Sequence, residues 1–162
     1  MIVVSDTTAI SSLHKIQQLP LLQKIFVEVI ISSEVFEELK YFESINSEFN
    51  FTKTYPWIKV ETATDQQLIK SLEEILDKGE SSAIALAIQL HADLVLIDEK
   101  QGRKVAVQQG LSIIGLVGVL EVAKKRNLIP ALKPLLNDLI DVANFRISKN
   151  LYERTLEAVN EK

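Results

Sequence analysis

Acidic residues stand at four points of this sequence from which their carboxylates could meet. Two of these points follow apolar runs and two lie on expected helices; the residues are Asp6, the pair Asp98 and Glu99, Glu38, and Glu80. Carboxylates gathered in one cleft repel one another, so each must be protonated, paired with a cation or bridged by a metal ion. Mg²⁺ or Mn²⁺ meets this need, because hard divalent cations prefer oxygen ligands. The chemistry indicated is metal-assisted hydrolysis of a phosphodiester bond.

Each of these acids also has a simpler structural explanation. Asp6 belongs to the residue types that cap helix N-termini, and Glu80 completes an Asp77-x-x-Glu80 pattern that is typical of a helix start. A purely structural role explains the acids at 98–99 less well, although one of them could cap a helix that starts near this point. The combination of acids, rather than any one of them, indicates a site.

The apolar runs predict that these acids share one edge of a sheet. Residues 2–4 and 94–97 are short runs of branched apolar residues, which are typical of strands buried on both faces. Strands and helices alternate along the chain, and this order predicts a parallel sheet with right-handed crossovers. In open parallel sheets, ligands bind at the carboxyl ends of the strands. The expected fold is therefore α/β, with three α/β/α layers and a central parallel sheet.

Periodicity and turn residues predict the remaining elements. Further strands are expected at 27–31, 57–60 and 112–116, and helices at 9–16, 19–25, 32–39, 64–79, 80–90, 102–109 and 117–126. Residues 41–56 show no clear period and are expected to form a loop. A single domain over residues 1–162 is expected from the length. Its last two helices, from about 131 onward, are separated near Asn144, with Ser148 as a cap, and pack on the domain or on a partner.

At the acidic positions the sequence resembles the PIN-domain nucleases. The matching segments are Asp6-Thr7-Thr8, Val35-x-x-Glu38-Leu39, Gly79-Glu80 before an Ala-rich helix, and Leu96-Ile97-Asp98-Glu99 with Gly102-Arg103 beyond it. More narrowly, the sequence is similar to the DUF3368 branch, which shares a Gly-x-x-Gly-Val-Leu segment, here at 115–120. This resemblance runs from Ile2 to about Leu156. It implies a PIN-like fold and Mg²⁺- or Mn²⁺-dependent cleavage of RNA, often by the toxin of a toxin–antitoxin pair.

The resemblance also implies a role for each matching residue. Asp6 would be the central metal ligand, and Glu38 would be the helix-borne acid that orients water. Glu80 and Asp98 would be the remaining ligands, and Thr8 would form a hydrogen bond in the site.

The sequence departs from the commonest PIN pattern in two places. Glu80 stands where many members have Asp, and Ile97-Asp98-Glu99 stands where many have Thr-x-Asp. Successive strand residues face opposite ways, so the register decides whether Asp98 or Glu99 points inward. We expect Asp98 to point inward, with Glu99 as an accessory metal ligand. The departures leave a second hypothesis open, a catalytically inactive PIN-like module that binds nucleic acid or has a regulatory role.

Basic residues beyond the second acidic strand are candidates for substrate binding. Lys100, Arg103 and Lys104 would surround the acidic site, and Arg103 can hold a phosphate through two nitrogens. His14 and His91 are isolated from other ligand types and are not expected to bind metal. The aromatic residues between 49 and 57 are expected to form a small local core.

The composition of the chain argues against several classes of protein and of site. The net charge of −4 and the pI near 5.3 argue against a surface that coats polyanions, so contact with RNA must be local. The sequence has no cysteine, which excludes disulfides and thiolate metal sites. Its apolar stretches are shorter than the roughly 20 residues that span a bilayer, and no signal-peptide pattern is present. We expect a cytoplasmic protein without a membrane span.

Two further expectations concern partners and a competing chemistry. From the resemblance we expect RNA as substrate, an antitoxin protein as partner, and a homodimer. A phosphatase of the haloacid-dehalogenase type would need a second Asp two residues after Asp6, where Thr8 stands. A receiver domain would need an acidic pair at the first strand end and a lysine on a late strand, and the sequence has neither.

Overall fold

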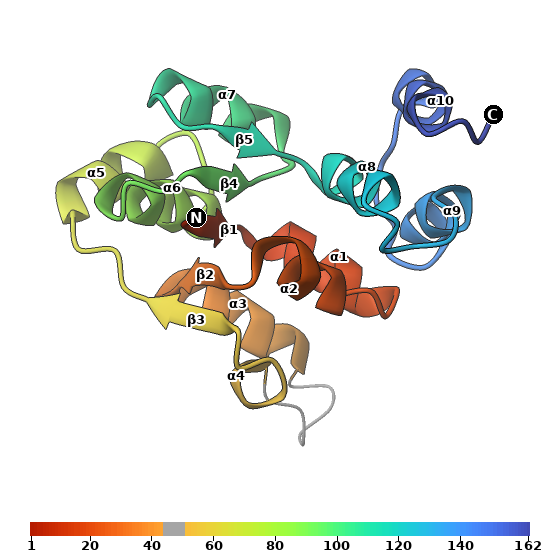
Figure 1. Cartoon of the computed structure of the whole chain (residues 1–162). Helices are drawn as coiled ribbons and strands as arrows, with labels where there is room; N and C mark the ends of the chain where they lie inside the picture. Colours follow the sequence, from red (N-terminus) through yellow and green to blue (C-terminus); the bar gives the residue numbers. More distant parts are fainter. Residues whose placement is uncertain (44–50) are drawn as a thin grey trace.

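A five-stranded sheet organises the protein and brings the carboxyl ends of its strands to one edge (Figure 1). The structure is a computed structural model that describes residues 1–43 and 51–162. The strand order is β3-β2-β1-β4-β5 and every pair is parallel. The strands are β1 (Val3–Ser5), β2 (Val29–Ser32), β3 (Ile58–Glu61), β4 (Leu94–Leu96) and β5 (Ile113–Ile114). The expected three-layer α/β/α fold with a central parallel sheet is confirmed.

Strand β1 lies at the centre of the sheet because its residues are apolar enough to be covered on both faces. Val3 and Val4 are 1% and 0% exposed. Val4 pairs with Ile30 of β2 on one side and with Val95 of β4 on the other. The chain builds β2 and β3 on one side of β1 and then returns to build β4 and β5 on the other. The strand order therefore reverses between β1 and β4, and a crevice at the carboxyl ends of these strands is a common ligand site.

Helices pack on the sheet and against one another. Helix α6 contacts β1, β2 and β4 and lies beside α3 and α5, whereas α2 contacts β2 and α8. The apolar residues of α6 are almost fully buried, as expected from its alanine-rich stripe. Over residues 1–43 and 51–162 the helices are α1 (Thr7–Lys15), α2 (Pro20–Phe26), α3 (Ser33–Glu43), α4 (Phe51–Thr54), α5 (Gln66–Glu73), α6 (Lys78–Gln89), α7 (Lys100–Gln108), α8 (Leu116–Lys125), α9 (Lys133–Asp141) and α10 (Lys149–Ala158).

The loop expected at 41–56 is wrong at both ends, because α3 continues to Glu43 and residues 51–54 form the short helix α4. Helix α4 forms because Phe51 is buried and meets the His14 ring edge-on, with 5.1 Å between ring centroids. The Tyr55 and Trp57 rings also touch, 5.8 Å apart, which confirms the expected local aromatic core for these residues. Residues 44–50, including Phe49, lie outside the described part of the chain.

The helix expected at 64–79 is shorter, because α5 starts one residue later than its capping pattern predicts and ends at Glu73; Gly79 lies inside α6 and does not end α5. The cap of α5 is Asp65, whose side chain accepts a hydrogen bond from the Leu68 backbone N–H, 3.0 Å away. The expected strand at 112–116 shortens to the two residues of β5, because Gly115 already precedes helix α8.

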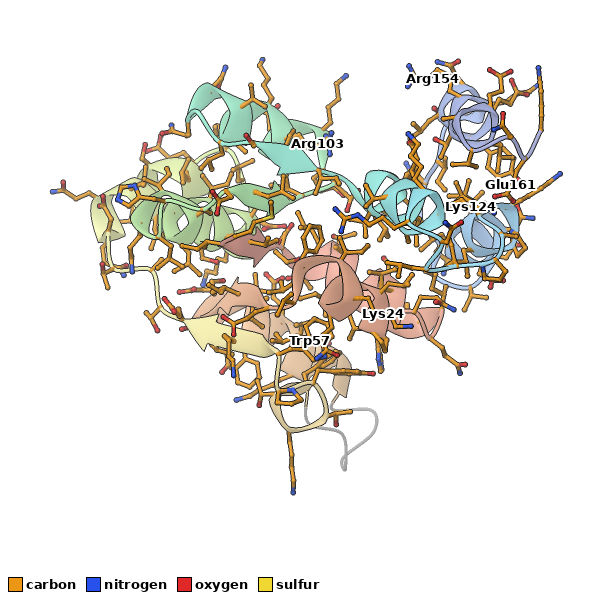
Figure 2. The ribbon with its side chains drawn as sticks, in the orientation of Figure 1. Lys24, Trp57, Arg103, Lys124, Arg154 and Glu161 are labelled. Carbon is orange, nitrogen blue, oxygen red and sulfur yellow. The ribbon has the colours of Figure 1, made fainter. Side chains whose placement is uncertain are left out.

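The two C-terminal helices lie beside α8 (Figure 1). Ser148 caps α10 as predicted, accepting a hydrogen bond from the Leu151 N–H. The Glu161 carboxylate accepts hydrogen bonds from the Leu132 and Lys133 N–H groups, at 2.7 and 3.2 Å. It also lies 3.9 Å from the Lys124 ammonium (Figure 2). The chain end is thereby tied to the start of α9. Among the described helices, none has the length and apolar character needed to cross a bilayer.

Candidate functional site

A cavity of about 500 Å³ opens at the carboxyl edge of the sheet and is lined mainly by acidic and hydroxyl side chains. Among the residues that the structure describes, neither lysine nor arginine lines it. We call it the acid cavity and define it by its five carboxylates, which come from four segments of the chain: Asp6, Glu38, Asp77, Glu80 and Glu99. The hydroxyl groups on its wall belong to Thr7, Thr8, Ser11 and Tyr41. The structure therefore brings Asp6, Glu38, Glu80, Glu99 and Thr8 together, as the sequence predicts.

Asp6 is held where β1 passes into α1. Its backbone N–H donates to the Leu96 carbonyl of β4, 3.0 Å away. Its Oδ1 accepts a hydrogen bond from the Thr7 N–H at 2.7 Å, so Asp6 also caps α1. Only 4% of the residue is exposed. The capping explanation and the site explanation thus both apply, because the cap uses one carboxylate oxygen and the other remains available.

Glu38 reaches the cavity from α3 and rests on a glycine. The Thr7 hydroxyl donates a hydrogen bond to Glu38 Oε2. The Glu38 carboxylate lies so close to Gly79 that a Cβ there would meet its two oxygens at 2.6 and 2.7 Å. The buried hydroxyls of Ser32 and Ser82, 2.7 Å apart, join the end of β2 to α6 and hold these two elements together. Gly79 is therefore needed for the close approach of Glu38.

Asp77 and Glu80 bring two carboxylates to the cavity from the start of α6. Asp77 Oδ1 accepts a hydrogen bond from the Glu80 N–H at 2.8 Å and caps the helix. Glu80 is 6% exposed. Asp77 is a cavity residue that the sequence did not indicate as such. The Asp77-x-x-Glu80 pattern predicts the cap, but no local signal says that the cap also faces the other acids.

Asp98 and Glu99 lie in the opposite order to the one expected. Strand β4 ends at Leu96, so strand alternation no longer governs the direction of residues 98 and 99. Glu99 lies at the rim of the acid cavity. Asp98 turns toward α8, where its Oδ1 accepts a hydrogen bond from the Leu116 N–H at 2.9 Å. The acid cavity thus contains Glu99 and not Asp98.

Burial and crowding raise the pKa values of two cavity acids. Burial raises the pKa of Asp6 to about 8, against the Thr7 N–H hydrogen bond, which lowers it; Glu80, Asp77 and Glu38 add to the rise. Burial likewise raises the pKa of Glu80 to about 7, with the Asp77 and Glu99 carboxylates adding to it. Both shifts arise because burial and the neighbouring carboxylates penalise the charged form of each acid.

The donor set fits a hard divalent cation. Within residues 1–43 and 51–162, none of the five carboxylates forms an ion pair with a basic side chain. No three acidic or histidine side chains of these ranges form a ready cage for an ion. Mg²⁺ is usually held by one or two carboxylates, several waters and a substrate phosphate, so the unpaired carboxylates are the ligands that such an ion would use.

The predicted basic and histidine residues lie outside the acid cavity. Arg103 donates from Nη1 to the Ile97 carbonyl, 2.8 Å away, on the Asp98 side of the strand end. Lys100 and Lys104 are exposed on α7 and do not line the cavity. His14 packs in the aromatic cluster, and burial lowers its pKa. Direct contact between the predicted lysines and a phosphate stays a prediction.

Comparison with protein families yields one match over nearly the whole chain. Residues 2–161 match the family model DUF3368, described as a PIN domain. No curated protein and no solved structure matches the chain significantly.

Proposed function

The chain belongs to the DUF3368 family of PIN domains, and from this premise we propose that it is a metal-dependent ribonuclease with the acid cavity as its active site. PIN domains are generally nucleases, so the family itself indicates a nuclease-like function. The observation that carries the finer proposal is the cavity, in which the described residues include five carboxylates and no basic side chain, at the reversal point of a parallel sheet.

The residues would divide the work according to their positions. Asp6, Glu80 and Glu99 would hold Mg²⁺ or Mn²⁺. When bound, such an ion lowers the pKa of a coordinated water and stabilises negative charge on the phosphate. Glu38 Oε2 accepts a hydrogen bond from the Thr7 hydroxyl, which leaves Oε1 to orient the attacking water and take its proton. Thr8 lies on the cavity wall where its hydroxyl can contact the substrate phosphate.

Cleavage of single-stranded RNA by the purified full-length protein tests this proposal. We expect cleavage with Mn²⁺ or Mg²⁺, none in EDTA, and recovery when the ion is restored, with single-stranded DNA of the same sequence cut more slowly. Metal binding at the acid cavity without cleavage of any RNA or DNA would overturn the proposal and favour the inactive PIN-like module.

The toxin role, the antitoxin partner and the homodimer stay proposals that derive from the family resemblance. A short upstream reading frame with a DNA-binding pattern, whose product relieves growth arrest caused by this protein, would support the toxin role. Arrest that persists unchanged in an Asp6→Asn variant would contradict it.

Gly79→Ala is expected to lower cleavage about tenfold with little change in melting temperature. The added Cβ would displace the Glu38 carboxylate, which is the flexible end of a side chain and moves at small energetic cost. Loss of exact placement of a catalytic group is costly even when the fold is intact. Single-turnover cleavage and thermal denaturation give the two readouts.

The control for this effect is the same substitution in a Glu38→Ala background. If Gly79→Ala acts through Glu38, it adds little further loss there, since the two residues share one interaction. An equal loss in both backgrounds would show that Gly79 acts by another route.

Glu99→Gln is expected to reduce cleavage by at least tenfold more than Asp98→Asn. Glu99 lines the acid cavity, whereas Asp98 serves the N-terminus of α8. Asp98→Ala should instead lower the free energy of unfolding by about 1–2 kcal/mol, because the Leu116 N–H loses its acceptor. Cleavage rates and urea denaturation distinguish the two roles, and the reverse ranking would return Asp98 to the metal site.

A further inference from the structure

A second groove adjoins the acid cavity and continues away from it along α1. The groove has a volume of about 440 Å³ and shares Thr8, Ser11 and Glu99 with the acid cavity. One wall is α1, ending with Lys15, and the other is the segment 143–146 between α9 and α10. We call it the α1 groove. A chain that enters the acid cavity can therefore extend into it without leaving the surface.

The α1 groove supplies the positive charge that the acid cavity lacks. Lys15 and Arg146 both line it, together with the carboxylates of Asp98 and Glu99, whereas the described residues that line the acid cavity are all acidic or uncharged. In the described part of the chain, no hydrogen bond or ion pair engages the Arg146 guanidinium, which is exposed. A polyanion that places one phosphate among carboxylates needs cations for its neighbouring phosphates. Arg146 is suitably placed to contact one of them.

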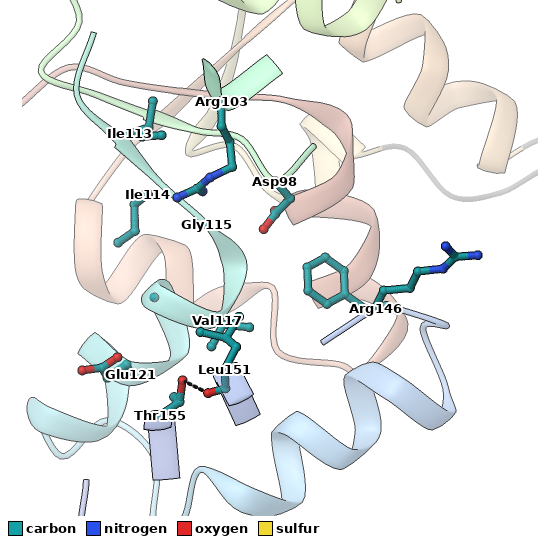
Figure 3. A pocket seen from close by; sticks show the side chains of 12 residues that line it. Asp98, Arg103, Ile113, Ile114, Gly115, Val117, Glu121, Arg146, Leu151 and Thr155 are labelled. Carbon is teal, nitrogen blue, oxygen red and sulfur yellow. Dashed lines mark hydrogen bonds between the residues drawn. The ribbon is translucent and has the colours of Figure 1, made fainter. Parts of the chain in front are cut away.

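Arg146 lines the α1 groove and also the neighbouring cavity that contains Asp98 and Arg103. Figure 3 shows the Arg103 side chain close to Gly115 and Asp98, while Arg146 extends away from both. Arg103 is also occupied, since it donates to the Ile97 carbonyl. Of these two arginines, the one with an unengaged guanidinium is the one that lines the α1 groove.

Phe145 presents a half-buried aromatic surface beside this charge. It lines both the α1 groove and the cavity that contains Asp98 and Arg103, so it stands between them. Its backbone N–H donates to the Leu139 carbonyl at 2.8 Å, which anchors the segment to the end of α9. Asn144 turns the chain in the left-handed region, with φ of 54°, a conformation that asparagine tolerates better than most residues. The aromatic ring is therefore carried by a fixed turn.

We propose that the α1 groove binds the nucleotide adjacent to the scissile phosphate of single-stranded RNA. Arg146 contacts that nucleotide's phosphate and Phe145 stacks on its base. Stacking on an aromatic side chain requires an unpaired base, so the groove selects single strands over duplexes. This inference rests on the proposed ribonuclease function and adds the substrate contacts that the acid cavity does not provide.

The first test compares Arg146→Ala with Arg154→Ala in the full-length protein. Arg154 is exposed on α10 (Figure 2), lines none of the three cavities described here and has the same charge. In single-turnover cleavage with Mn²⁺, we expect Arg146→Ala to raise the half-saturating protein concentration roughly tenfold and to reduce the salt dependence by about 0.7 in log–log slope. The maximal rate should change by less than about twofold, and Arg154→Ala should resemble the wild type.

The second test uses Phe145→Leu, which keeps apolar bulk and removes the aromatic face. A series of RNAs carries one abasic nucleotide moved along the strand. At one position next to the cleaved bond, the abasic nucleotide should weaken wild-type binding about fivefold or more, as expected for a lost stacked base. Phe145→Leu should weaken binding of intact RNA similarly and add nothing on that abasic RNA.

The outcomes separate this inference from the function on which it rests. Wild-type cleavage with equal effects of Arg146→Ala and Arg154→Ala, or with no position-specific effect of Phe145→Leu, would overturn the groove assignment alone. Absence of wild-type cleavage of any RNA would overturn both.

Discussion

Asp6→Asn is expected to reduce RNA cleavage by at least about 10²-fold while the protein stays folded. Removal of outer partners of metal ligands alone typically costs 10- to 100-fold, and loss of a direct ligand should cost at least as much. Asparagine keeps the Oδ1 acceptor for the Thr7 N–H, so the cap of α1 survives. Because the pKa of Asp6 is about 8 without a bound ion, the neutral amide also resembles the protonated wild-type side chain at pH 7. Single-turnover cleavage and thermal denaturation measure both effects.

Asp93→Asn is the matched control for this substitution. Asp93 lies just before β4, at the amino end of the sheet, and its Oδ2 accepts a hydrogen bond from the Ile2 N–H at 2.6 Å. Asp93→Asn is the same chemical change as Asp6→Asn at the opposite edge of the sheet, so cleavage should stay within about twofold of the wild type. Equal cleavage by Asp6→Asn and the wild type would contradict the assignment of Asp6.

The second large effect is a loss of stability with rising pH in the metal-free protein. The pKa of Asp6 is raised from 3.8 to about 8 and that of Glu80 from 4.5 to about 7. Between the unfolded and folded pKa values the folded state holds more protons than the unfolded state. The stabilising effect is therefore complete below about pH 4, decreases steadily above it, and is fully lost once the pH has risen through 7 to 8. For one such group the slope is at most about 1.4 kcal/mol per pH unit.

The comparison of wild type with Asp6→Asn isolates this contribution. His14, whose pKa is lowered by burial, acts in the opposite direction and is common to both proteins. In EDTA, the free energy of unfolding of the wild type should fall relative to Asp6→Asn from pH 5 to pH 8. A wild type that gains stability relative to the variant over this range would contradict the raised pKa.

Divalent ions should reverse this loss. An ion binds the carboxylate form, so its affinity and its stabilising effect should increase with pH. We expect Mn²⁺ to raise the melting temperature of the wild type more at pH 8 than at pH 6, and to have little effect on Asp6→Asn. The same Mn²⁺ shift in both proteins would place the ion elsewhere.

The sequence predicts the fold and most of the acid cavity because their signals are local. A buried strand followed by Asp6 can be identified from six residues, and the parallel order then requires later strand ends to meet it. The same reasoning places Glu38 and Glu80 at this edge, because the helices that carry them follow these strands or pack on them. Here topology turns separate patterns into one site.

The features that the sequence did not predict depend on contacts between distant segments. The direction of Asp98 is set by the Leu116 N–H, 18 residues later. Helix α4 depends on packing of Phe51 against His14. The α1 groove joins α1 to residues 143–146, and no repeated spacing connects them. Each of these three features is determined by tertiary packing, about which the periodicity of the sequence carries no information.

The position of a Mn²⁺ ion in crystals of the full-length protein tests the central claim most directly. The measurement is an anomalous difference map from crystals soaked in Mn²⁺, with cleavage activity confirmed for the same preparation. The account predicts a peak in the acid cavity with an Asp6 oxygen bound directly and an oxygen of Glu80 or Glu99 beside it. An active preparation whose Mn²⁺ lies only outside this cavity would contradict the account.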